Sequence, residues 1–143
     1  VKEAKLHGFW DGQTVTLNLP LLPNEMPKEE RRAQTDAARE ALVTELARDE
    51  PQGWRLPPEV KVENYAEHWA NEVLPLAREA HERLQFSGIG RRQDDAQTLA
   101  VGVAAEKPAA DGVPYDEWAA KVVREELHKA GWRLADLLEQ ALR

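Results

Sequence analysis

The chain contains no cysteine among its 143 residues. This absence excludes disulfide bridges and zinc sites built on thiolates, so a metal bound here would need His, Asp or Glu ligands. Long apolar runs are absent too, and none approaches the roughly 20 residues that a membrane-spanning helix needs. The first residues, Val1 to Ala4, lack the apolar stretch of a signal peptide, which a mature exported protein would also lack.

Positive charge is scarce, because 19 Lys and Arg residues face 26 Asp and Glu residues, for a formal net charge of −7. This balance argues against a nucleic-acid binder that works by charge alone, since such proteins are usually basic. It does not exclude an enzyme that holds phosphate through bound cations, because divalent ions reverse the local field. The length is sufficient for one domain with a core.

Apolar residues recur at helical spacing in several stretches, and this periodicity predicts an all-α fold. The predicted helices span residues 3–11, about 28–48, 62–84 and 116–142. The first is short and holds Gly8, so it is marginal as an isolated helix. We expect residues 12–27 to form an extended connection, because they contain several prolines.

Glycine and proline predict further details between and within these helices. Residues 87–114 are expected to be mostly loop, with at most a short extended piece at 99–103. Pro75 should kink its helix, because it removes a backbone donor. Gly131 makes sense if another helix crosses closely at that point. Trp54 lies between helices and is expected to be exposed.

The sharpest local feature is the pair His7 and Asp11. Positions i and i+4 lie on one face of a helix, with Cβ atoms about 5–6 Å apart. An imidazole and a carboxylate so placed can converge on one zinc ion, although two ligands cannot complete a tetrahedral site. His68 and Glu72 have the same spacing, which we interpret as a surface or capping pair.

The segment Leu6-His7-Gly8-Phe9-Trp10-Asp11 resembles the Asn-Leu-His-x-x-Trp-Asp motif of the single-strand-specific zinc nucleases of the S-one/P-one type, relatives of the zinc-dependent phospholipases C. Two further stretches follow in the family's order. Residues 69–72 resemble its Trp-Ala-x-Glu-Ser helix start, and residues 130–138 resemble its Ala-Gly-x-Arg-Leu-Ala-x-Leu-Leu helix. Among the departures, Lys5 replaces the motif's Asn, Val73 replaces its Ser, and Gly12 stands where fungal members often carry Asn.

The resemblance covers essentially the whole chain but only the second half of the family domain. It implies the helical phospholipase C and single-strand nuclease fold, a cluster of three zinc ions, and cleavage of single-stranded DNA and RNA to 5′-nucleotides, often with 3′-nucleotidase activity. His7 and Asp11 would bind one metal, and the missing amino-terminal half would supply the other ligands. Trp10 would either shape the metal site as an outer-shell residue or anchor the helix in the core. The family implies a secreted or periplasmic location.

Two other functions remain open at the level of the sequence. The first is a zinc-dependent phospholipase C or phosphatase on the same scaffold, which shares the metal chemistry. The second is a non-enzymatic helical interaction module in which His7 and Asp11 are incidental. Metal content separates the second from the enzymes, and the choice between lipid phosphodiesters and denatured DNA as substrate separates the first from a nuclease.

Overall fold

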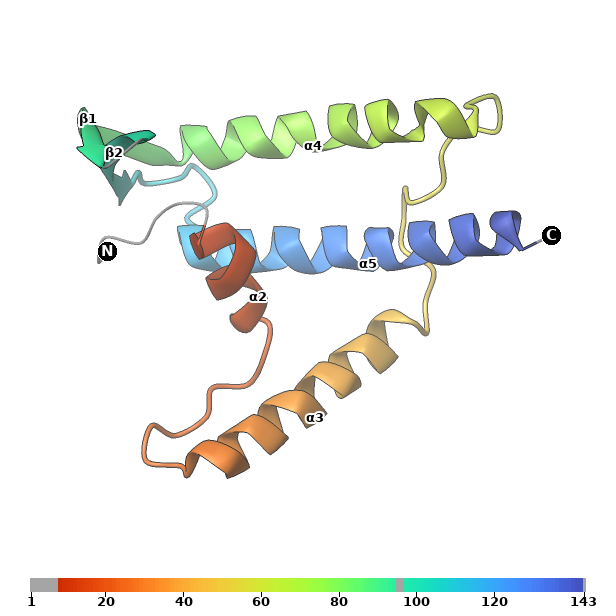
Figure 1. Ribbon diagram of the computed structural model, residues 1–143, viewed down its shortest axis with the longest axis horizontal. Helices are drawn as coiled ribbons and strands as arrows, with labels where there is room; N and C mark the ends of the chain where they lie inside the picture. Colours follow the sequence, from red (N-terminus) through yellow and green to blue (C-terminus); the bar gives the residue numbers. More distant parts are fainter. Residues whose placement is uncertain (1–7, 95–96, 143) are drawn as a thin grey trace.

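The computed structural model describes residues 8–94 and 97–142, and it is mainly helical, as the apolar periodicity predicts. Its longest helices are α3 (Lys28–Leu46), α4 (Tyr65–Glu82) and α5 (Tyr115–Ala141). In Figure 1, α5 runs through the middle, with α4 along one side and α3 crossing obliquely on the other. A 3-10 turn at Val62–Asn64 precedes α4, at the point where the third helix was expected to begin.

The end of α3 is attached to α5 by polar contacts. Arg124 on α5 forms an ion pair with Glu45, and the indole nitrogen of Trp132 donates to the carbonyl oxygen of Leu46 at 3.3 Å. The alanines of the predicted apolar stripe of α3 are exposed, and α3 has no buried residue. Its stripe therefore faces no core within the described part of the chain, contrary to the expectation of one shared core.

A β-hairpin replaces most of the loop that was predicted after α4. Strand β1 (Leu84–Asp94) pairs antiparallel with β2 (Gln97–Glu106), with an irregularity in register between Ser87 and Gly90. The loop prediction was wrong because the glycines in this stretch were interpreted as breaks, although they lie within the two strands. The prolines of the same stretch come only after the second strand. The backbone N–H of Lys107 donates to the Arg83 carbonyl at 2.9 Å and joins the hairpin's end to that of α4.

Trp54 is buried, with 6% of its surface exposed, contrary to the expectation of an exposed loop residue. Its ring lies 5.6 Å from that of Trp132, and its indole nitrogen donates to Glu50 at 2.6 Å. Its carbonyl oxygen accepts a hydrogen bond from Arg133. The connection between α3 and α4 is thus pinned to α5, since its aromatic side chain gains more by packing than by exposure.

The main core is small and lies where the end of α4, the start of α5 and the segment around Trp10 meet. Its buried members are Ala80, Leu84, Tyr115, Trp118, Ala119 and Val122. The chain exposes 11380 Å², and its mass is 16.2 kDa. A folded monomer of that mass exposes about 7,500 Å², so this chain exposes roughly half as much again.

Across residues 8–94 and 97–142, no helix combines the length and the apolar character that crossing a membrane requires. This agrees with the absence of long apolar runs in the sequence.

Candidate metal centre

The short helical segment that carries Asp11 is built differently from the expectation. A π-helical turn spans Phe9–Gln13 and leads into α2 (Thr14–Thr16), so the helix continues beyond Asp11 into the predicted connection. The hydroxyl of Thr14 donates to the Trp10 carbonyl at 2.6 Å, and Thr14 is fully buried. Single π turns within helices occur frequently at functional sites, because they re-aim the side chains that they carry.

Aromatic packing anchors this segment to α5. The Trp10 ring lies edge-on to Trp118 at 5.9 Å and edge-on to Tyr115 at 6.2 Å. Phe9 adds a tilted contact with Tyr115 at 5.6 Å. Such edge-to-face arrangements are favourable, since the positive edge of one ring meets the negative face of another. Trp10 thus occupies the position of a core anchor.

Asn18 adds a polar link between the same segment and α5. Its side-chain amide donates to the Ala120 carbonyl at 2.9 Å and to the Thr14 carbonyl at 3.0 Å. The sequence prediction missed Thr14 and Asn18. The signal was the spacing of Trp10, Thr14 and Asn18, four residues apart, which places all three on one helical face.

Asp11 follows Trp10 and is exposed, whereas Trp10 is half-buried. The segment therefore holds its aromatic residue against α5 and presents a carboxylate at the surface. His7, the other predicted ligand, lies outside the described residues. Among residues 8–94 and 97–142, no three His, Asp or Glu side chains gather closely enough to hold a metal. Within this part of the chain, Asp11 therefore has no two further potential ligands beside it, whereas a zinc ion requires four.

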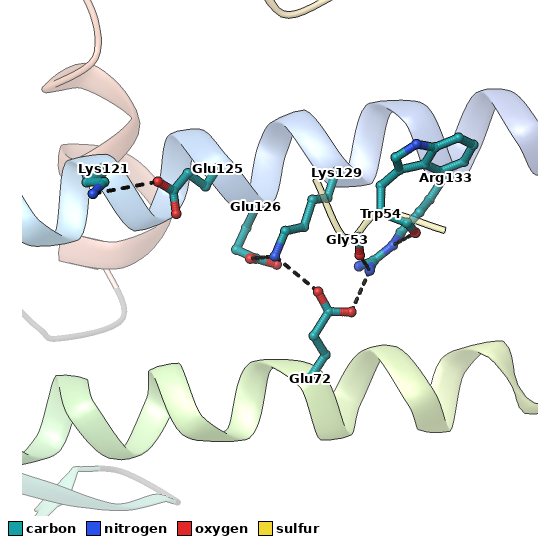
Figure 2. A network of polar contacts seen from close by, with 8 residues as sticks. All are labelled: Gly53, Trp54, Glu72, Lys121, Glu125, Glu126, Lys129 and Arg133. Carbon is teal, nitrogen blue, oxygen red and sulfur yellow. Dashed lines mark hydrogen bonds and ion pairs between the residues drawn. The ribbon is translucent and has the colours of Figure 1, made fainter. Parts of the chain in front are cut away.

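The second pair with ligand spacing, His68 and Glu72, does not behave as the expected surface pair. His68 is exposed, while the Glu72 carboxylate turns to α5. One Glu72 oxygen accepts from Lys129 at 3.1 Å, and the other pairs with Arg133 (Figure 2). Burial works to raise the pKa of Glu72, but hydrogen bonds and charges from Lys129 and Arg133 outweigh it and hold the pKa below its ordinary value.

Arg133 lies at the centre of this network. Its side chain is only 8% exposed, and its hydrogen-bond and ion-pair partners lie on α4 and on the connection before α4. It donates to the Trp54 carbonyl at 2.9 Å and to the Gly53 carbonyl at 3.3 Å, besides its ion pair with Glu72. Charge-assisted hydrogen bonds of this kind are stronger than neutral ones. The network therefore fixes α4, α5 and the preceding connection relative to one another.

An apolar groove of about 420 Å³ lies between α4 and α5, beside Trp10. Val73, Leu76 and Val123 contribute to its walls, as does Tyr115. The Tyr115 hydroxyl is buried and lacks a hydrogen bond of ordinary geometry among the described residues; burial raises the pKa of this side chain, and a weaker hydrogen bond from Trp10 acts to lower it. Buried polar groups are nearly always paired, so this hydroxyl stands out.

Comparison with known proteins identifies no relative: no family model, no curated protein and no solved structure matches the chain.

Proposed function

We propose that this chain is the carboxy-terminal half of a zinc-dependent nuclease domain that hydrolyses single-stranded DNA and RNA to 5′-nucleotides, with 3′-nucleotidase activity. The observation that carries this proposal is the Leu6-His7-Gly8-Phe9-Trp10-Asp11 motif. Its supporting geometry is a tryptophan packed against α5 and a neighbouring exposed aspartate. That arrangement suits a ligand whose direction must be fixed by the residues around it.

The other two stretches that resemble the family add independent support. One contributes Glu72 on α4 and the other contributes Arg133 on α5. These two residues are 61 positions apart in the sequence and form an ion pair. Two stretches that resemble the family thus contact each other, as the proposal of a single domain expects.

In this proposal, the Asp11 carboxylate and the neutral imidazole of His7 bind one ion of a three-zinc cluster. Trp10 orients the segment by packing against the start of α5. The amino-terminal half of the domain supplies the remaining ligands. Bound zinc lowers the pKa of a water molecule to about 7 and neutralises charge that develops on the phosphate, so no serine or cysteine nucleophile is needed. A secreted or periplasmic location belongs to the same proposal.

The test measures zinc content and hydrolysis of denatured DNA in the complex of this chain with the amino-terminal half-domain. His7→Ala and Asp11→Asn should each lower activity by about 100-fold or more, and should lower bound zinc, because each removes a direct ligand. The matched control is His68→Ala, which removes an exposed histidine far from the motif.

Unchanged zinc content and unchanged hydrolysis in both ligand variants would refute the site. A parallel assay with phosphatidylcholine and a phosphate monoester tests the neighbouring activities of the same scaffold. Cleavage of the lipid or the monoester in place of DNA would keep the metal assignment and replace the substrate. Absence of zinc from the complex would leave only a helical interaction module.

A further inference from the structure

The helical segment that carries Asp11 departs from α-helical hydrogen bonding at Thr14. In an α-helix, each carbonyl accepts from the backbone N–H four residues further along. The N–H of Thr14 donates instead to the Phe9 carbonyl, five residues back, and so closes the π turn. The Trp10 carbonyl, which this N–H would serve in an α-helix, accepts from the Thr14 hydroxyl at 2.6 Å. A side-chain donor thus takes the place of a backbone donor.

The same exchange occurs one turn later, at Asn18. The backbone N–H of Asn18 donates to the Val15 carbonyl at 3.2 Å, three residues back. The Thr14 carbonyl accepts from the side-chain amide of Asn18 at 3.0 Å. The same amide nitrogen donates to the Ala120 carbonyl of α5 at 2.9 Å. A chain of hydrogen bonds therefore runs from α5 through both side chains to the Trp10 carbonyl.

Burial makes the Thr14 hydroxyl hard to replace. Thr14 has no exposed surface, so water cannot take over the bond to the Trp10 carbonyl. Leaving a buried carbonyl without a donor is costly, and the nearest substitute is the N–H of Thr14 itself. Its transfer from Phe9 to Trp10 would convert the π turn into an α-helical turn. Thr16 makes a similar bond to the Gly12 carbonyl at 2.9 Å, but in an exposed position where water can replace it.

The type of turn decides how the residues before Thr14 face α5. A π turn holds one residue more in its hydrogen-bonded ring than an α-helical turn. Conversion would therefore rotate the residues before it by up to about 100° around the helix axis. Trp10 and Asp11 both belong to this part, and Trp10 is packed edge-on against Trp118. The π turn thus fixes the direction of the Asp11 side chain while Trp10 keeps its packing.

We propose that Thr14 and Asn18 are positioning residues for Asp11: they hold the π turn against α5 and thereby set the direction in which the carboxylate faces. The use of that carboxylate rests on the proposed function. The hydrogen-bond chain and the turn that it holds rest on the geometry of the segment alone.

The first experiment identifies the carbonyl that accepts from the Thr14 N–H, through the NMR coupling that crosses a hydrogen bond. In this chain, the coupling should join the Thr14 nitrogen to the Phe9 carbonyl carbon. Thr14→Val keeps the shape of the side chain but removes its donor, so the coupling should move to the Trp10 carbonyl. Thr14→Ser restores the hydroxyl and should return the coupling to Phe9. The matched control is Thr16→Val, which should leave it at Phe9.

Asn18→Asp supplies a second measurement that leaves the buried position 14 unchanged. The carboxylate has nearly the size of the amide but donates no hydrogen bond, so the link to Ala120 is lost. Hydrogen exchange of the Thr14 amide should accelerate by about tenfold or more, whereas Asn24→Asp should change it by less than about twofold. A coupling from Thr14 to Trp10 in the unaltered chain would overturn the proposal. So would a coupling that stays at Phe9 in Thr14→Val, or unchanged exchange in Asn18→Asp.

Hydrolysis of denatured DNA, measured in the complex that tests the proposed function, separates the two proposals. Thr14→Val should lower kcat by about tenfold or more with KM changed by less than about twofold, because the carboxylate is present but misdirected. Thr14→Ser should restore kcat. If Asp11→Asn lowers kcat and Thr14→Val does not, the positioning role is wrong and the nuclease stands. If Asp11→Asn leaves both zinc content and kcat unchanged, the proposed use of the carboxylate fails, and the NMR result decides whether Thr14 and Asn18 hold the turn.

Discussion

The hydroxyl of Tyr115 is a single polar group whose cost can be measured directly. The Tyr115 ring packs against the rings of Phe9, Trp10 and Trp118, and the buried hydroxyl has no hydrogen bond of ordinary geometry within the described residues, only a weak one from Trp10. An unsatisfied buried group costs about 1–3 kcal/mol, and removing it without changing the ring relieves that cost. We expect Tyr115→Phe to raise the free energy of unfolding of the isolated chain by about 1 kcal/mol, measured by urea denaturation.

The effect of Tyr115 on the stability of the chain also depends on pH. Burial raises the pKa of Tyr115 above its ordinary value of 10.0, so the folded chain retains a proton that the unfolded chain releases at high pH. Ionisation therefore does not affect the stability of the folded chain below pH 10, and stability falls as pH rises from there through the raised pKa. The advantage of Tyr115→Phe should grow above pH 10, and a constant advantage would show that the hydroxyl is paired or solvated.

The pH dependence of stability expected from Glu72 has the opposite sign to that expected from Tyr115. Its pKa lies below the ordinary value of 4.5 because Lys129 and Arg133 outweigh the effect of burial. The stabilisation is thus fully present above pH 4.5 and disappears as pH falls through the lowered pKa. Glu72→Gln should cost about 1–2 kcal/mol at pH 7, a value discounted for partial exposure, because it leaves Arg133 without its carboxylate.

The measurement is urea denaturation of both proteins from pH 7 downward, and the difference between them should shrink below pH 4.5. The control is Glu125→Gln, which removes an exposed carboxylate 3.9 Å from Lys121 and should change stability by less than about 0.5 kcal/mol. Figure 2 contrasts this exposed pair with the network around Glu72. A cost equal at pH 7 and at the lowest pH would contradict the assigned ion pairs.

Among the elements, α4 contains a proline in its interior. The helix runs from Tyr65 to Glu82 with Pro75 inside it, where proline removes one backbone donor and crowds the preceding turn. Pro75→Ala should stabilise the chain by about 1–2 kcal/mol, less than the full propensity difference because alanine also gives the unfolded chain more freedom. Thermal unfolding tests this, with Ala77→Pro as the reverse change. A fall in stability for Pro75→Ala would show that a local bend matters for packing.

Helical periodicity made the long helices predictable, because their apolar residues recur through many turns. Helical periodicity failed where an element is short, or where the residues that usually end an element, such as glycine, lie inside it. The helix around Asp11 extends to Thr16 because Thr14 and Asn18 bond backward and across to α5, contacts that no local propensity encodes. The hairpin after α4 was missed because glycines within strands look like breakers when the partner strand is unknown. Trp54 is buried by a residue far along the chain, Trp132.

The site was less predictable than the fold. The motif predicted Asp11 as a ligand and Trp10 as its neighbour, and the structure shows that Asp11 is exposed and that Trp10 packs against Trp118. Sequence spacing could not show that Glu72 belongs to a network with Arg133, since a carboxylate four residues from a histidine looks the same in either role. Only the approach of α4 and α5 distinguishes the two.

At the scale of the whole molecule, the proposed function couples metal binding to assembly, because this chain supplies only two of the ligands. One imidazole and one carboxylate cannot hold zinc tightly by themselves, because the ion needs four ligands. We expect zinc to leave the unfolding midpoint of the isolated chain unchanged. In the complex with the amino-terminal half-domain, zinc at 100 times its dissociation constant should add about 2.7 kcal/mol for one site.

Differential scanning fluorimetry with and without a chelator measures this dependence. Asp11→Asn should abolish most of the zinc-dependent shift in the complex, because it removes one proposed ligand and leaves the anchor Trp10 in place. A zinc-dependent shift of equal size in the isolated chain would place a complete site within this polypeptide. A shift retained by Asp11→Asn in the complex would instead assign the metal entirely to the other half.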